Sequence, residues 1–276
     1  QKMKAIGLMA GGVAHDLNNI LSGIISYPEL LLLDLEETHR MRRPLEAIRK
    51  SGLAAAEVVA DLLTVARGIA ANREVVNANT LIDDYLASPD FQQLQIRFPL
   101  ISISKSLDRG LRNVSCSPIH IRKCLMNLIT NGMEAIQGKG ALSITTLNHQ
   151  QSDQVLHNKQ ILAQGLYVKI IICDSGSGIA AHELEHIFEP FYTKKVMGRS
   201  GTGLGLAVVW NTMMDHGGIV NVFSDKHGTT FELYLPSVDS SKIIVSEISD
   251  WRMFKGNGET VLVVDDEPLQ RAIAQE

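Results

Sequence analysis

Cysteine is scarce in this sequence, which has three among its 276 residues: Cys116, Cys124 and Cys173. The number is odd and no two of them form a CxxC pair. The sequence therefore offers neither a disulfide framework nor a thiolate metal site. This pattern favours reduced thiols, so we expect a reducing compartment and a cytoplasmic location.

Long apolar runs are also missing. A membrane-spanning helix needs about 18 or more consecutive apolar residues. The most apolar stretch, ILSGIISYPELLLL at residues 20–33, is interrupted by Ser, Tyr, Pro and Glu. We therefore expect no membrane segment in this chain. The chain begins with Gln1 inside a helical pattern, so it looks like a fragment, and a sensor or membrane portion could lie upstream.

An excess of positive charge is absent as well. Lys and Arg number 26 against 30 Asp and Glu, which gives a net charge of −4. A surface that binds nucleic acid needs a basic excess, so nucleic acid is not expected as the main partner. Two common phosphate-binding signatures are also missing, because GxxxxGK[ST] does not occur and GTGLGL at residues 201–206 is not GxGxxG.

The first 71 residues carry a heptad pattern, with apolar residues at alternating spacings of four and three. Residues 34–43 are polar and read as a turn, after which Pro44 suits the first position of a second helix. One such hairpin has too little core to be stable alone, so we expect two copies to pair as a homodimer. The seam residues are Ile6, Ala10, Val13, Leu17, Ile20, Ile24, Tyr27 and Leu31 in the first helix and Leu45, Ile48, Gly52, Ala55, Val59, Leu62, Ala66 and Ile69 in the second.

From residue 72 the pattern changes to helices interleaved with mostly antiparallel strands, which predicts an α+β sandwich. A polar loop that contains NHQQSDQ, residues 148–154, is expected before the next strand, and residues 237–258 indicate a linker. The expected fold class is thus multidomain, with an all-α hairpin forming a dimeric four-helix bundle followed by the sandwich. We expect one short helix that begins near Asn79 or Thr80 and two further helices at 117–136 and 204–217. Strands are expected within 94–107, 141–148, 166–174, 218–225 and 229–236.

Two asparagines in NLITN, Asn127 and Asn131, are four residues apart and share one face of the predicted helix. Two amide oxygens on one face can hold a Mg²⁺ ion that also has phosphate oxygens as ligands. Two ordinary surface asparagines would give the same spacing, so this motif alone decides nothing.

Two glycine-rich segments follow. DSGSG at residues 174–178 ends an apolar strand, where Asp174 can accept a hydrogen bond from an exocyclic amine such as that of adenine, and where Gly176 and Gly178 permit a sharp turn. GTGLGL runs into a helix, and backbone amides at such a start suit phosphate.

The order of five motifs is far more specific than any one of them: HDLNN at 15–19, NLITN, DSGSG, FEPFYTKK at 188–195 and GTGLGL. In this order they resemble the phosphoacceptor box and the N, first glycine, F and second glycine boxes of the sensor histidine kinases of two-component signalling. The resemblance covers the chain to about residue 236. It implies the histidine kinase/Hsp90-like ATPase fold for the sandwich.

The resemblance implies that His15 attacks the γ-phosphate of ATP through one ring nitrogen and that Asp16 orients the proton on the other. Asn19 would help in phosphoryl transfer or position water for a phosphatase reaction. Asn18 receives no role. Alone, His15 would read as an ordinary surface histidine; here its position off the seam predicts that it faces solvent and the ATP domain.

The resemblance also implies an ATP site with Mg²⁺. Asn127 and Asn131 would hold the metal and phosphates, and Asp174 would read the adenine amine. Residues 192–203 would form a lid in which Lys195 contacts phosphate and Arg199 either reaches the γ-phosphate or is simply solvated. Glu134 stands where many relatives have a basic residue. The remaining nucleotide-binding residues would be Gly176, Gly178, Gly201, Thr202, Gly203, Leu204 and Gly205.

The C-terminal residues resemble the start of a receiver domain, with Asp265 and Asp266 as its acidic pair, which makes the parent similar to a hybrid kinase. We expect a phosphotransfer hairpin at 1–71, an ATP-binding domain at 72–236, a linker at 237–258 and a truncated, non-functional receiver start at 259–276. The expected partners are a second copy of the chain, a receiver domain in the same or a separate protein, and an upstream sensor domain.

Three other interpretations compete with a kinase. The Hsp90, MutL and gyrase ATPases share the fold, but they carry a water-activating Glu where this chain has Asn127, and they lack the HDLNN hairpin. A non-catalytic scaffold would have lost motif residues, and all of them are present. A phosphatase-biased enzyme stays open, because Asn19 suits that reaction too.

Overall fold

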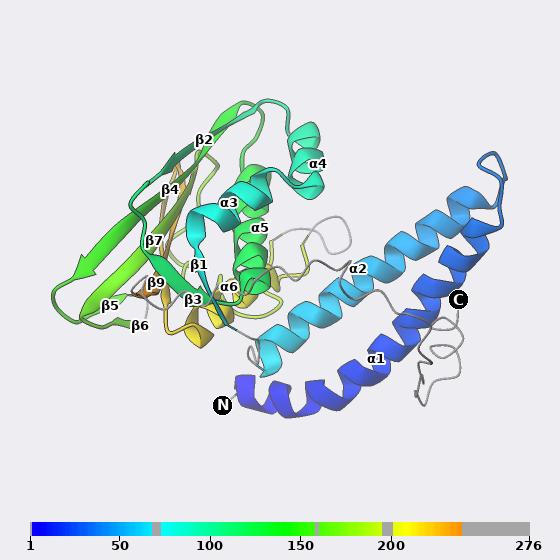
Figure 1. Ribbon diagram of the computed structural model, residues 1–276, viewed down its shortest axis with the longest axis horizontal. Helices are drawn as coiled ribbons and strands as arrows, with labels where there is room; N and C mark the ends of the chain where they lie inside the picture. Colours follow the sequence, from blue (N-terminus) through cyan, green and yellow to red (C-terminus); the bar gives the residue numbers. More distant parts are fainter. Residues whose placement is uncertain (1, 68–72, 158–159, 195–200, 239–276) are drawn as a thin grey trace, which may run out of the picture. The chain divides into compact units, whose positions relative to one another are not determined.

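The computed structural model describes residues 2–67, 73–157, 160–194 and 201–238, with the side chains of residues 2–16, 66–67 and 157 outside that description. Two long helices come first, α1 (Lys2–Leu33) and α2 (Arg42–Arg67), and a sheet with further helices follows. Figure 1 shows α1 and α2 running side by side as a hairpin.

The turn of the hairpin is closed by an arginine. The guanidinium Nη1 of Arg42 donates to the carbonyl oxygens of Leu32 (3.3 Å) and Leu35 (3.0 Å), which satisfies backbone acceptors at the end of α1. Because Arg42 is already helical, α2 begins two residues before Pro44, the start that the sequence predicted. Pro28 is buried inside α1, and the helix continues past it.

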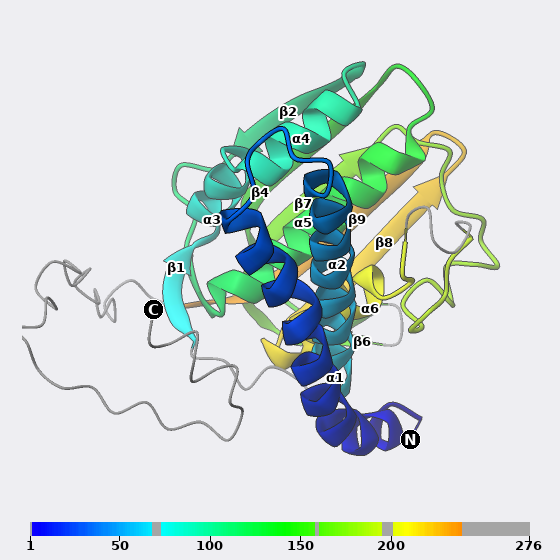
Figure 2. The ribbon, with the colours of Figure 1, turned by 90° about the vertical axis from the view of Figure 1, so that its right-hand side faces the viewer.

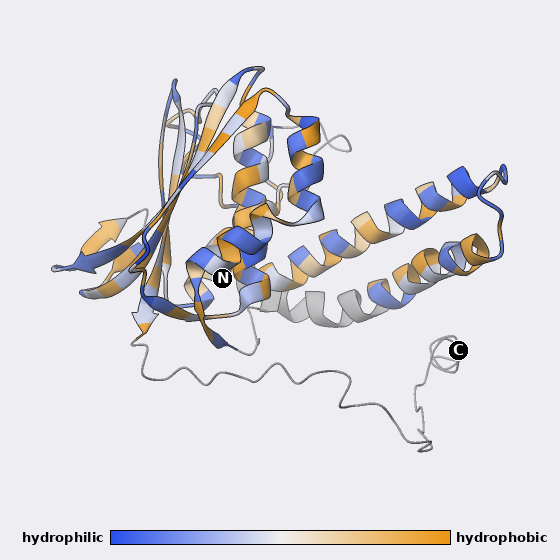
Figure 3. Ribbon diagram, turned by 45° about the horizontal axis from the view of Figure 1, so that its top comes forward, coloured by the Kyte–Doolittle hydropathy of each residue, from blue (hydrophilic) through white to orange (hydrophobic). Residues whose placement is uncertain are grey.

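The hairpin buries little of its apolar surface. Leu21 and Val59 form its small core, with Leu17, Ala55, Ala56 and Leu63 packed around them. Apolar and hydrophilic residues alternate along both helices (Figure 3). Several predicted seam residues of α1 are exposed in the single chain: Ile20 (62%), Ile24 (41%), Tyr27 (56%) and Leu31 (52%).

The second region is a seven-stranded sheet in the order β1-β3-β9-β7-β4-β2, with β8 paired to β9. Only the β2–β4 pair is parallel among the described strands of this sheet. A separate two-stranded hairpin is formed by β5 and β6. The strands are β1 (Glu74–Asn77), β2 (Ile101–Leu107), β3 (Asn113–Cys116), β4 (Gly140–Gln151), β5 (Val155–His157), β6 (Gln160–Leu162), β7 (Gly165–Asp174), β8 (Ile219–Asp225) and β9 (Gly228–Val238).

Four helices accompany this sheet: α3 (Ala78–Leu86), α4 (Pro89–Arg97), α5 (Pro118–Ala135) and α6 (Gly205–Asp215). They lie on one face of it, as Figures 1 and 2 show together. The core between the two layers includes Leu125 and Ile129 of α5 and Ile144, Ile170 and Leu233 of the sheet. The predicted helical hairpin followed by an α+β sandwich is confirmed.

One predicted strand is partly wrong. Residues 94–97, assigned to strand, end helix α4, and β2 begins only at Ile101. The helix starts at a strong capping sequence, because the Ser88 hydroxyl accepts a hydrogen bond from the Phe91 N–H (3.3 Å) and Pro89 suits the first turn.

Several further strands were not predicted, among them β3 and the β5–β6 hairpin. The segment read as a polar loop after residue 148 continues β4 to Gln151 and leads into the β5–β6 hairpin. Between residue 72 and the helix expected near Asn79 no strand was predicted, but β1 lies there and its four residues pair with β3. The end of β4 and strand β1 are both partly exposed, and their polar side chains resemble those of loops.

Candidate functional site

Helix α5 carries the two asparagines of NLITN. It begins at Pro118 after Ser117, a residue type that often caps the start of a helix. The cap hydrogen bond is not formed, because the Ser117 hydroxyl instead lies 2.8 Å from Nδ1 of His120. Asn127 and Asn131 both line one cavity beside the helix.

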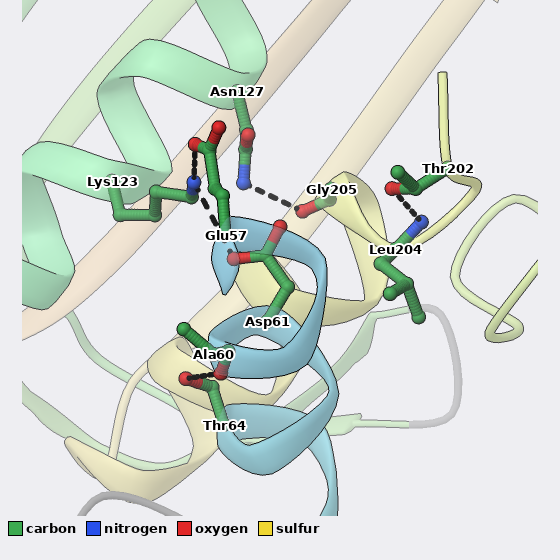
Figure 4. A network of polar contacts seen from close by, with 9 residues as sticks. All are labelled: Glu57, Ala60, Asp61, Thr64, Lys123, Asn127, Thr202, Leu204 and Gly205. Atoms are coloured by element: carbon green, nitrogen blue, oxygen red, sulfur yellow. Dashed lines mark hydrogen bonds and ion pairs between the residues drawn. The ribbon is translucent and has the colours of Figure 1, made fainter. Parts of the chain in front are cut away.

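Asn127 joins α5 to the start of α6. Its Nδ2 donates to the carbonyl oxygen of Gly205 at 3.1 Å, as Figure 4 shows. This bond fixes the orientation of the amide. The side-chain oxygen is therefore the atom that Asn127 can offer to a ligand in the cavity.

Asp174 ends β7 and is almost fully buried. One carboxylate oxygen accepts the Gly176 N–H at 2.8 Å. Burial raises the pKa of this carboxyl, and the backbone N–H groups of Gly176 and Thr229 oppose the rise. A buried carboxylate that lines a cavity can accept a hydrogen bond from an amine, as the sequence analysis expected.

The turn after Asp174 packs tightly on the neighbouring strands. Gly178 has φ +72°, and a Cβ atom there would lie 1.7 Å from the carbonyl oxygen of Asp225. No other residue fits this position without moving the backbone. The Ser224 hydroxyl then accepts the Ile179 N–H at 2.8 Å and holds the turn in place.

The second glycine segment is tied to the end of the F motif. Phe191 and Gly203 both have positive φ (67° and 69°), and the Phe191 N–H donates to the Gly203 carbonyl at 2.9 Å. The Thr202 hydroxyl accepts the Leu204 N–H at 3.2 Å just before α6 begins (Figure 4). Leu204 itself is buried.

The structure gathers most of the predicted nucleotide-binding residues around a cavity of about 930 Å³. This volume lies within the range of small-molecule sites. Gly176 and Leu204 do not line it, and they act through the backbone turn and the core instead. Those that do line it are Asn127, Asn131, Asp174, Gly178, Gly201, Thr202, Gly203 and Gly205.

The lining of the cavity also includes the charged residues Glu134, Glu183 and Lys194. Lys194 pairs with Glu183, and this hydrogen bond holds the pKa of the Glu183 carboxyl below its usual range. Glu134, the acidic departure from the family pattern, lies 3.4 Å from the Arg97 guanidinium of α4. Arg97 therefore supplies a positive charge beside Glu134, and it comes from a helix, α4, that was not predicted. Lys195 and Arg199 fall outside the described residues.

Helix α2 forms part of the cavity wall. Ala54, Glu57, Val58 and Asp61 line it, and Lys123 of α5 pairs with both Glu57 and Asp61. Burial raises the pKa of Asp61 despite the nearby lysine. Lys123 was missed, although its place four residues before Asn127 puts it on the same face of α5.

The acceptor motif lies on α1. His15 and Asp16 belong to the helix, but their side chains fall outside the description. Asn19 is half-buried, whereas its neighbour Asn18 is exposed. The roles assigned to His15, Asp16 and Asn19 therefore stay predictions.

Comparison with known proteins gives two family matches. Residues 5–71 match the His Kinase A (phospho-acceptor) domain, and residues 116–239 match the histidine kinase-, DNA gyrase B- and HSP90-like ATPase family. The cavity and the hairpin thus lie in the two domain types that together define a class of signalling kinase. The chain belongs to the histidine kinases of two-component signalling.

The chain is similar to curated sensor kinases of several bacteria. The chain is 32% identical to sensor kinase CckA of Brucella abortus over 98% of this chain and 29% of the relative. It is 32% identical to sensor histidine kinase ZraS of Escherichia coli K12 over 86% of this chain and 46% of the relative. The chain thus spans less than half the length of these relatives.

A solved structure supports the fold. Full-length ShkA, crystallised in complex with AMPPNP, superimposes with a TM-score of 0.62 at 20% identity, over 85% of this chain and 46% of that one. Within the described ranges, no helix combines the length and apolar character needed to cross a bilayer.

Proposed function

We propose that this chain binds ATP with Mg²⁺ in the cavity beside α5 and phosphorylates itself on His15. The observation that carries the proposal is the cavity itself, where a buried carboxylate, two amides of one helix face and the glycine segment before α6 converge. The family matches and the AMPPNP complex of ShkA support the same nucleotide class.

The two ends of the cavity suit the two ends of ATP. Asp174 would accept the adenine amine, since the carboxylate is buried at the end of β7. The backbone N–H groups of Gly203 and Gly205, at the start of α6, would meet the phosphates. Catalysis in such a site is mainly positioning and charge stabilisation.

The donor set of α5 suits Mg²⁺. The Asn127 and Asn131 side chains supply amide oxygens, and Mg²⁺ takes oxygen ligands, several of them from water and phosphate. No group of three or more His, Cys, Asp or Glu side chains placed to hold a metal occurs within the described residues. When held by these two side chains, the ion would supply positive charge that stabilises the phosphates during transfer.

His15 would be the acceptor. One ring nitrogen forms a bond to the γ-phosphorus while the bond from that phosphorus to the β–γ bridging oxygen breaks, and ADP leaves. Asp16 would hold the proton on the other ring nitrogen, so that a neutral lone pair attacks. Asn19, one helical turn later, would orient the phosphoryl group.

The proposed kinase function also implies binding partners. The exposed seam of α1, with Ile20, Tyr27 and Leu31, would be buried by a second copy as a four-helix bundle. The phosphoryl group would then pass to an Asp of a receiver domain, in the cytoplasm. The division into 1–71, 72–236, a linker and a receiver start at 259–276 belongs to this proposal, and its C-terminal part lies outside the described residues.

The test is incubation of the purified chain with γ-labelled ATP and Mg²⁺, beside His15→Gln and the matched control His39→Gln in the hairpin turn. We expect label that is labile in acid and stable in alkali in the parent chain and in His39→Gln. His15→Gln should carry none.

Label that survives in His15→Gln would overturn the assigned acceptor. Absence of label in a chain that binds ATP would favour the phosphatase-biased or scaffold role. A chain that binds no ATP would overturn the proposal as a whole.

A further inference from the structure

Two lysines among the described residues line the cavity, and each is paired with a carboxylate. Lys194 pairs with Glu183 from the segment before the F motif. Lys123 of α5 pairs with two carboxylates of α2. The triphosphate of ATP is strongly anionic, so these pairings matter for how the cavity receives it.

Lys123 is placed where the phosphates are expected. It lies one helical turn before Asn127 on the same face of α5, and both residues line the cavity. Figure 4 shows its side chain beside that of Asn127, which reaches the start of α6. The lysine side chain is 21% exposed, and the residue is part of the cavity lining.

The partners of Lys123 are carboxylates from far away in the chain. Its Nζ contacts Glu57 and lies 3.4 Å from Asp61 Oδ1, and both carboxylates also line the cavity. Asp61 is only 13% exposed, so its charge is poorly screened by water. Carboxylate oxygens and phosphate oxygens compete for the same ammonium group.

We propose that Lys123 is a phosphate-binding residue of the ATP site and that Glu57 and Asp61 of α2 occupy it when nucleotide is absent. This inference rests on the proposed ATP binding. Because binding effects are reciprocal, phosphates that take Lys123 weaken its bond to α2, and the α2 carboxylates weaken ATP binding.

Helix α2 also contacts the ATP domain at a second place, away from the charged residues. Val65 of α2 packs on Ala207 and Val208 of α6, and this contact is apolar. Neutralising the carboxylates therefore leaves α2 a way to remain on the ATP domain. A change in ATP affinity can then be ascribed to the charges.

The experiment measures the binding of MgATP and of adenosine to the full chain by calorimetry. The variants are Glu57→Gln/Asp61→Asn, Lys123→Gln and the triple combination. Asp84→Asn is the matched control, since Asp84 pairs with Arg122, the neighbour of Lys123, and does not line the cavity.

We expect the carboxylate double variant to bind MgATP about fivefold more tightly, the low end of typical coupling, with adenosine affinity unchanged. Lys123→Gln should weaken the binding of MgATP and leave the binding of adenosine unchanged. The triple variant should have the same MgATP affinity as Lys123→Gln. Asp84→Asn should match the parent. Lys123→Arg keeps the positive charge and should keep MgATP affinity, and unchanged adenosine binding by Lys123→Gln shows that this variant is folded.

Several results would overturn the inference. The gain in MgATP affinity could persist in the triple variant, which would mean that the carboxylates act without Lys123. Equal changes for adenosine and MgATP, or no change in the double variant, would also refute it. Lack of MgATP binding in every chain, parent included, would instead refute the proposed function on which the inference rests.

Discussion

In the sheet domain, α5 buries Ile121, Leu125 and Leu128 almost completely, whereas in the hairpin α1 leaves Ile20 and Leu31 more than half exposed. Both helices carry regular apolar patterns. The pattern of α5 is matched by a sheet in the same chain, and the pattern of α1 is only partly matched by α2. The difference teaches that periodicity shows which face will be buried but not which molecule buries it.

The largest effect is expected where the hairpin lacks its partner. The double variant Ile20→Glu/Ile24→Glu should weaken self-association by about 1000-fold, since two copies lose four apolar side chains at about 1 kcal/mol each. Analytical ultracentrifugation measures this. Ile96→Glu on α4, at a side chain 78% exposed, is the control and should leave association unchanged. Equal effects of the two changes would break the comparison.

A core substitution tests the other side of the comparison. Leu125→Ala on α5 should lower the free energy of unfolding of the sheet domain by about 3 kcal/mol, because it empties a closed core. Leu100→Ala, at a side chain 64% exposed, should change it by less than about 0.5 kcal/mol. Denaturant titration followed by near-ultraviolet circular dichroism distinguishes them. Similar losses from both would mean that the domain is not independently packed.

The sheet domain also has a residue whose burial serves binding rather than folding. Asp174→Asn should lower ATP affinity about thirtyfold, since a hydrogen bond to a charged group contributes about 2 kcal/mol. Its unliganded stability should not fall, because the raised pKa shows that the buried charge is unfavourable. Asp108→Asn, whose carboxylate likewise accepts an N–H two residues on, is the control. A lower free energy of unfolding with unchanged ATP affinity would contradict this role.

The smallest effect concerns pH. His216 in the sheet domain is buried, accepts the Ser117 N–H on Nε2 (2.9 Å) and lies 2.7 Å from the Thr212 carbonyl through Nδ1. Burial lowers its pKa, so the folded state binds a proton less readily than the unfolded state. Stability is therefore full above pH 6.5 and falls as the pH drops below it. His216→Gln should flatten this decline in thermal unfolding. His120 also has a lowered pKa, so His120→Gln must be measured alongside.

Much of this fold was predictable because long helices and buried strands have strong periods. The helices α1, α2, α5 and α6 and the core strands β7 and β9 agree with the patterns. Helix α4 was missed, since QQLQ offers few apolar positions and only the Ser88–Pro89 start marks it. The edge strand β1 was missed because it is short and partly exposed.

Residues of the site were predictable where they belong to sequence motifs, but their pairing with distant residues was not. Asn127, Asn131 and Asp174 lie in ordered motifs, and the structure places them at one cavity. The pairing of Lys123 with Glu57 joins residues 66 positions apart, and nothing in local spacing signals it. Arg97 beside Glu134 was out of reach for the same reason, since it depends on how α4 packs.

The bond between Phe191 and Gly203 has a consequence for how this family of sequences can vary. This hydrogen bond joins the two ends of the segment between Phe191 and Gly203. When such a segment lengthens, the free-energy cost of closing the loop rises slowly, by about 0.6 kcal/mol for each doubling of its length. Gly203 cannot change, because a Cβ atom there would lie 2.5 Å from the Phe191 backbone. Insertions and deletions between these two positions should therefore be tolerated by the fold, while Gly203 stays constant.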